Sequence, residues 1–227
     1  MHRLLQLFGT SLGRKLVMAV TGMALIGFLI AHMLGNMAIY QGPNALNDYA
    51  AWLEGHPLLW AVRAILLVIF STHVFTALSL AIENSGARPT AYRLRELVAA
   101  TLSSRYIVVS GLLLFVFVIY HLLHFTFGLV QPEYFDLRDA AGDRDVFEMV
   151  VYGFQNVWIS GSYVAAMLVL GFHLDHGAKR LFQTLGLNHE SYNSLIQVAA
   201  SGLILMLVLG NASIPILVLA GVIQVPH

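Results

Sequence analysis

The sequence predicts an all-α integral membrane protein with five transmembrane helices, and two observations carry that prediction. Of the 227 residues, 58% are hydrophobic and only 11% are charged, whereas roughly a quarter of the residues in a soluble domain are charged. Five apolar segments also reach the length of about 20 residues that crosses the hydrocarbon core of a bilayer. We find no convincing internal repeat or soluble region in the sequence, which favours a single domain over residues 1–227.

The five helices are expected at about 16–40, 58–82, 106–130, 150–174 and 195–223. More polar connections separate them, at about 41–57, 83–105, 131–149 and 175–194. The stretch before the first helix lacks a clear small-residue cleavage site, so we expect this helix to be retained rather than removed as a signal peptide.

Basic residues indicate how the helices cross the membrane, because Lys and Arg concentrate on the cytoplasmic side. The N-terminal stretch and the second and fourth connections share one side and carry Arg3, Arg14, Lys15, Arg88, Arg93, Arg95, Arg105, Lys179 and Arg180. The other side has only Arg63, Arg138 and Arg144 and a strongly acidic third connection. We therefore expect the N-terminus in the cytoplasm and the C-terminus outside.

One histidine lies deep in each of the first four apolar segments: His32, His73, His121 and His173. Ionisable groups at such depth are costly and usually functional, and imidazole is a common ligand of haem iron. The first and third helices run outward and reach His32 and His121 after about 16 residues, or roughly 24 Å at 1.5 Å per residue. The second and fourth helices run inward and reach His73 and His173 late.

Depth therefore pairs His32 with His121 in the outer half of the membrane and His73 with His173 in the inner half. Two imidazoles that face each other at one level are what a bis-histidine haem requires. We expect the first four helices to form a bundle that binds two b haems, with these four histidines as axial iron ligands. Because the sequence contains no cysteine, covalent haem attachment, iron–sulphur clusters and disulfides are excluded. The zero net charge argues against a nucleic-acid partner.

Two further histidines compete with the proposed ligands. His124 and His176 lie three residues beyond His121 and His173, on the same helical faces. Each is an alternative ligand, a partner for a haem propionate or part of a quinone pocket.

Other residues are secondary candidates. Arg93, Arg95 and Arg105 could neutralise propionates of the inner haem, although the positive-inside topology explains them equally well. Glycines in the first, third and fourth helices either let helices pack closely or leave room for a flat macrocycle. They are Gly22, Gly27, Gly35, Gly111, Gly153, Gly161 and Gly171.

The chain resembles a known family in motifs that occur in order on four helices. They are Gly-Phe-Leu-Ile-Ala-His32-Met, Val-Ile-Phe-Ser-Thr-His73-Val, Ser-Gly111 followed ten residues later by His121, and Gly-Phe-His173-Leu-Asp-His-Gly177. The family is the cytochrome b membrane-anchor subunit of succinate dehydrogenases and fumarate reductases, in the group with five helices and two haems. In this family the fourth-helix ligand stands four residues before a glycine, which selects His173 over His176, and the spacing from Gly111 selects His121 over His124.

The resemblance implies an anchor that docks a flavoprotein subunit and an iron–sulphur subunit at the cytoplasmic face of a bacterial inner membrane. Electrons from succinate oxidation, a step of the tricarboxylic acid cycle, would pass from the iron–sulphur subunit to the inner haem. They would go on to the outer haem and reduce a quinone, expected to be menaquinone. The chain alone is not expected to oxidise succinate, because it offers no flavin or succinate site. A higher oligomer is possible.

Two alternatives stay open on the sequence alone. One is a dihaem b anchor of another respiratory complex, such as a hydrogenase or a nitrate reductase. The other is a haemless transporter whose histidines carry protons or ligands. The quinone site is expected at the mouth of the outer haem, with a cytoplasmic site near His176 as the alternative.

Overall fold

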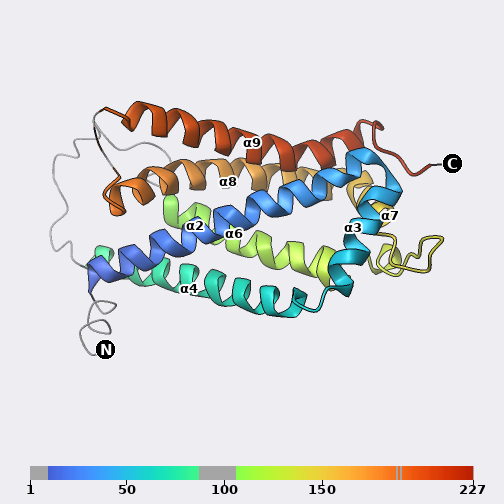
Figure 1. The fold of residues 1–227 in the computed structure, drawn as a ribbon, viewed down its shortest axis with the longest axis horizontal. Coiled ribbons are helices and arrows are strands. Elements are labelled where there is room, and N and C mark those ends of the chain that lie inside the picture. The colour runs from blue at the N-terminus through green and yellow to red at the C-terminus, as the bar shows by residue number, and fades with distance from the viewer. Residues whose placement is uncertain (1–9, 87–105, 188, 190, 227) are drawn as a thin grey trace.

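The computed structural model describes residues 10–86, 106–187, 189 and 191–226. Five long helices run side by side along the longest axis of the molecule and alternate in direction (Figure 1). They are α2 (Ser11–Asn36), α4 (Leu59–Gly86), α6 (Ile107–His121), α8 (Val157–Thr184) and α9 (Asn193–Leu219). All five are long and apolar enough to span a membrane. The expected all-α integral membrane fold is confirmed.

Two of the spans are extended by tighter or wider turns. A 3-10 helix, Met37–Gln41, continues α2, and a π-helical turn, Leu122–Thr126, continues α6. In the π turn, the Phe127 amide donates to the Leu122 carbonyl over 2.9 Å, which is an i to i−5 hydrogen bond. π turns of this kind are rare and often mark functional positions, and this one begins directly after His121.

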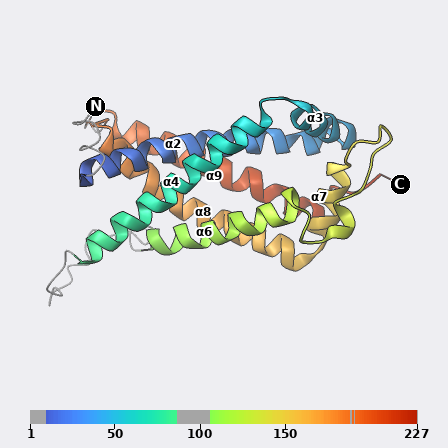
Figure 2. The ribbon, with the colours of Figure 1, turned by 90° about the horizontal axis from the view of Figure 1, so that it is seen from below.

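Four of the helices close into a ring. Within the described residues, α2 packs against α4, α4 against α6, α6 against α8, and α8 against α2. The fifth long helix, α9, lies outside this ring on α8 and α2 (Figure 2). A buried apolar cluster holds α2, α8 and α9 together through Met33, Ala166, Met167, Leu170, Leu174, Leu207, Val208 and Ala212. The four helices α2, α4, α6 and α8 therefore line the interior of the ring.

The fourth span begins and ends later in the sequence than predicted, although residues 157–174 belong to both. Instead of one helix over about 150–174, the structure has a short helix, α7 (Val146–Gln155), followed by α8. Asn156 separates them with an extended backbone (φ −78°, ψ 117°), and its side chain accepts hydrogen bonds from the amides of Trp158 and Ile159. The polar pair Gln155–Asn156 interrupts the apolar sequence at this point, and the Asn156 N-cap marks where α8 begins. The bounds of the other four spans differ from the expected ones by a few residues at their ends.

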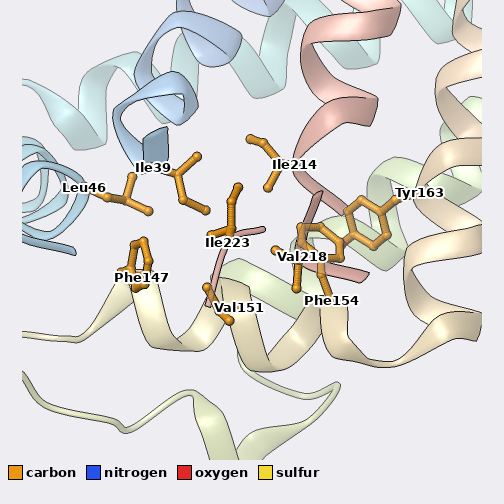
Figure 3. Close-up of a cluster of buried hydrophobic side chains, with 9 residues drawn as sticks. All are labelled: Ile39, Leu46, Phe147, Val151, Phe154, Tyr163, Ile214, Val218 and Ile223. Atoms are coloured by element: carbon orange, nitrogen blue, oxygen red, sulfur yellow. The ribbon is translucent and has the colours of Figure 1, made fainter. Parts of the chain in front are cut away.

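The first connection, expected at about 41–57, contains a helix that the sequence analysis missed. This is α3 (Pro43–Gly55), which starts with a proline after Gly42. It lies beside α7 at the end of the bundle where α2 ends, and both cover an apolar cluster there (Figure 3). The cluster contains Ile39, Leu46, Phe147, Val151, Phe154, Tyr163, Ile214, Val218 and Ile223. Ile39 and Leu46 come from the α2–α3 segment, and Ile214, Val218 and Ile223 come from the C-terminal end of the chain.

A buried amide links the two short helices. The Asn47 side chain of α3 donates to the Asp145 carboxylate over 3.1 Å and accepts from the Phe147 amide over 2.9 Å. Asp145 also caps α7 by accepting from the Glu148 amide over 2.8 Å. These contacts close one end of the bundle, which we call the capped end.

Candidate functional site

The histidines of the first and third spans meet near the capped end. His32 lies in the last two turns of α2, and His121 is the last residue of α6. Their ring centroids are 5.8 Å apart, with the ring planes at 88°. His32 stacks on Phe28, and His121 contacts Phe117. The structure therefore brings together the two residues that depth alone had paired.

The histidines of the second and fourth spans lie deeper in the bundle. His73 is near the middle of α4 and His173 is near the middle of α8, on two helices that lie diagonally opposite in the ring. Each is contacted by a hydroxyl from the preceding span. Thr21 Oγ1 lies 3.0 Å from His73 Nδ1, and Ser110 Oγ lies 3.2 Å from His173 Nδ1.

A glycine next to each hydroxyl allows this close approach. A Cβ atom at Gly22 would lie 3.4 Å from Cε1 of His73, and one at Gly111 would lie 3.3 Å from Cε1 of His173. The imidazoles thus lie directly against the backbone of the neighbouring helix. Other glycines pack helices instead, since Gly35 faces Tyr49 and Gly171 faces Val208.

The two histidine levels are separated by the same interval on two helices. Gly22, which touches His73, stands ten residues before His32, and Gly111, which touches His173, stands ten residues before His121. Ten residues of α-helix span about 15 Å. The bundle therefore has two pairs of histidines at levels about half a hydrocarbon core apart.

The two pairs of histidines fit the axial positions of b haems better than they fit bare metal ions. A protein-bound zinc ion usually takes three or four protein ligands, and among the described residues no group of three or more His, Cys, Asp or Glu could hold a metal ion. A porphyrin supplies four nitrogens itself and needs only two axial ligands, which is the number each level offers. At Gly22 and Gly111 the neighbouring helix presents no side chain of its own to the inner imidazoles, so the rings lie against its backbone.

The His124 side chain differs from that of His121 in its hydrogen bonds. Its Nδ1 is 2.9 Å from the Tyr163 hydroxyl, its Nε2 is 3.0 Å from Gln131 Oε1, and only 3% of the residue is exposed. Both ring nitrogens are therefore engaged, which favours His121 as the ligand. Tyr163 also contacts the ring of His121 and so links the two histidines.

His176 and three arginines are the remaining candidates from the sequence. His176 lies one helical turn after His173 and interacts with it electrostatically. Arg93, Arg95 and Arg105 lie outside the described residues. The sequence analysis missed Thr21, Ser110 and Tyr163. The sequence holds a signal for the first two. In the first and third spans, a hydroxyl residue is followed by a glycine that stands ten residues before the histidine.

Together, the helices and the spans define an all-helical, multi-pass integral membrane protein with histidines inside its bundle. A model of the succinate dehydrogenase/fumarate reductase transmembrane subunit family matches residues 84–209, more than half of the chain. The chain belongs to this family and is a membrane anchor subunit of the cytochrome b type, which associates with the other subunits of such a complex in the membrane. The match covers His121 and His173 and leaves His32 and His73 outside it. No curated protein and no solved structure matches the chain significantly.

Proposed function

We propose that the chain is the dihaem cytochrome b anchor of a succinate:quinone oxidoreductase, with His32 and His121 holding an outer haem and His73 and His173 an inner haem. The observation that carries this proposal is the arrangement of two histidine pairs on four helices at levels about 15 Å apart. When bound, the two haems would supply one-electron transfer between the levels. The protein contributes ligands, burial and a dry path through the bilayer.

The inner level is proposed to face the partner subunits. Arg14, Lys15 and Arg180 lie at the end of the bundle away from the cap. That end is proposed to be cytoplasmic because basic residues favour this side, and it would dock the iron–sulphur and flavoprotein subunits in a bacterial inner membrane. The capped end, with the exposed Trp52 and Trp158, would lie at the outer interface, where tryptophan is enriched.

The quinone, expected to be menaquinone, is proposed to bind near the outer level. A shallow, open hollow of about 340 Å3 there is lined by Tyr120, Trp158, Ile159 and Ser162. Tyr120 contacts both His124 and Tyr163, and Tyr163 contacts His121. A mainly apolar hollow with phenol, indole and hydroxyl groups, connected to His121 through Tyr120 and Tyr163, suits the edge of a quinone ring.

Haem counting tests the proposed ligands. The complex, purified with its partner subunits, is expected to give two b haems per anchor chain in a pyridine haemochrome assay. His73→Leu and His173→Leu should each remove the same haem, and His32→Leu and His121→Leu should each remove the other. His56→Gln is the matched control, because His56 precedes α4 outside the bundle and its side chain contacts the amide of Leu58 and the ring of Trp52.

Three outcomes would contradict the proposal. A complex without haem would exclude the cytochrome and favour a haemless transporter. Loss of the same haem from His32→Leu and His73→Leu would exclude the pairing. Purification of the chain with neither a flavoprotein nor an iron–sulphur protein would exclude the anchor role.

A further inference from the structure

The two hydroxyl contacts of the inner histidines are built in the same way. Thr21 and Ser110 each precede a glycine, and each contacts Nδ1 of the histidine on the next span. These contacts join residues 52 and 63 positions apart. Since α2 with α4 and α6 with α8 repeat the same device, the inner level has an approximate internal symmetry.

The hydrogen-bond partners of the hydroxyls define which atoms carry protons. The Thr21 hydroxyl donates to the Val17 carbonyl over 2.7 Å, and the Ser110 hydroxyl donates to the Ile107 carbonyl over 3.0 Å. A hydroxyl has only one hydrogen, so toward the histidine it can act only as an acceptor. On this bonding pattern we assign the proton of His73 and His173 to Nδ1, which leaves the lone pair on Nε2.

The outer level lacks this device. Within the described residues, His32 and His121 have aromatic neighbours, and no side-chain hydrogen bond reaches either ring. The two levels therefore offer imidazoles of different electronic character, although each offers a pair of them.

We infer that Thr21 and Ser110 are positioning residues that set the tautomer and the donor strength of the two inner haem ligands. This inference rests on the proposed dihaem function. An imidazole whose Nδ1–H is hydrogen-bonded is a more basic metal ligand and is fixed in orientation. A more basic ligand stabilises ferric over ferrous iron, so these hydroxyls lower the reduction potential of the inner haem relative to the same site without them.

Valine and alanine replacements test the inference in the complete complex. Thr21→Val keeps the shape of the side chain and removes the hydroxyl. It is expected to raise the midpoint potential of the inner haem and change its low-spin EPR signal, while the outer haem keeps both properties. Ser110→Ala should act in the same direction, because it removes the hydroxyl that contacts His173 Nδ1. The double variant should show the largest shift.

Conservative variants and a matched control separate positioning from packing. Thr21→Ser and Ser110→Thr keep the hydroxyl and should restore wild-type potentials and signals. Thr184→Val is the control, since the Thr184 hydroxyl bonds the Arg180 carbonyl of its own helix at the end of α8 and should leave both potentials unchanged. The EPR signal and midpoint potential of the inner haem are identified as those that are missing from the His73→Leu variant.

The possible results distinguish this inference from the proposed function. A wild-type complex without haem overturns the proposed function. A wild-type complex with two haems, together with Thr21→Val and Ser110→Ala variants of unchanged potential and EPR signal, overturns only the inference. Equal shifts of both haems, or failure of Thr21→Ser to restore an inner haem lost from Thr21→Val, would show a packing effect and also overturn it.

Discussion

At the scale of single residues, the contacts between glycine and histidine limit what the inner level tolerates. Gly22 and Gly111 allow His73 and His173 to lie against the neighbouring helix, where even a Cβ would be tight. Cysteine, which could have offered other ligands, does not occur in the chain. If the inner level holds a haem as proposed, its binding should depend on the size of the residue opposite each imidazole.

Replacing Gly111 by valine should remove the inner haem and spare the outer one. The added Cβ would lie 3.3 Å from Cε1 of His173, and the two methyl groups of valine extend beyond it. Overpacking of this kind costs about 1–3 kcal/mol and would displace the ring. Haem stoichiometry and EPR spectra of the purified complex measure the effect. Gly27→Ala is the control, since a Cβ there meets nothing within 4 Å; retention of both haems by Gly111→Val would refute the prediction.

Glu148 gives the capped end a pH-dependent stability. Burial raises the pKa of Glu148 above its ordinary value of 4.5, and the nearby Asp145 carboxylate adds to this. Because the pKa is higher in the folded state, protonation of Glu148 stabilises the folded protein. This contribution to the free energy of unfolding is complete below the pKa of the unfolded state and is lost as the pH rises through the pKa of the folded state.

Glu148→Gln should therefore have a slightly higher Tm than the wild type at a pH of about 7, and the difference should vanish at a pH of about 4. The effect is expected to be small because most of the side chain is solvated. Thermal unfolding in detergent at the two pH values measures it. A lower Tm for the variant at the higher pH would mean that interaction of the charge with the first turn of α7 dominates.

At the scale of elements, the short helices α3 and α7 depend on a polar link in an apolar setting. Asn47 is 5% exposed and Asp145 is 8% exposed, and they meet between the two helices. The α3 helix could have been predicted from Pro43 at its first position and from its apolar positions. Its docking on α7 could not, because Asn47 and Phe147 are 100 residues apart.

Asn47→Ala should destabilise the capped end by about 1–3 kcal/mol, because the Phe147 amide would lose its buried acceptor. Thermal unfolding and hydrogen exchange at α7 would show the loss. Asn44→Ala is a suitable control, since Asn44 lies on the exposed side of the same helix. Equal stability of the two variants would contradict the role of the link.

At the scale of the whole molecule, the direction of insertion is open to a simple test because the chain has no cysteine. Arg14 of α2 pairs with Glu83 of α4 over 2.6 Å at the end away from the cap, whereas Arg144 pairs with Glu54 at the capped end. The excess of basic residues at the end opposite the capped end predicts that this end faces the cytoplasm.

Single cysteines should report this orientation without background. Ala141→Cys, in the exposed acidic loop, is expected to react with a membrane-impermeant maleimide in intact spheroplasts. Lys15→Cys, exposed at the other end, should react only after permeabilisation. The opposite labelling pattern would reverse the proposed topology and move the inner histidine pair to the outer side.

The sequence by itself determined the class of fold, the approximate position of four of the five spans and one buried histidine per helix in the first four. These features can be read locally, since a single imidazole in a long apolar run stands out and two positions on one helix have a known spacing. The expected pairing of His32 with His121 agrees with the observed ring contact, because depth in a membrane follows from position along a span.

Only the tertiary structure decided which partners those histidines have. The contacts of Thr21 with His73, of Ser110 with His173 and of His124 with Tyr163 join different helices, and hydropathy carries no information about them. The break at Asn156 likewise depends on the structure, because apolar residues flank the short polar pair Gln155–Asn156 on both sides and only the side-chain cap redirects the backbone. Rotation of each helix about its axis is determined by packing between helices, so the atoms around each imidazole become known only when the bundle is assembled.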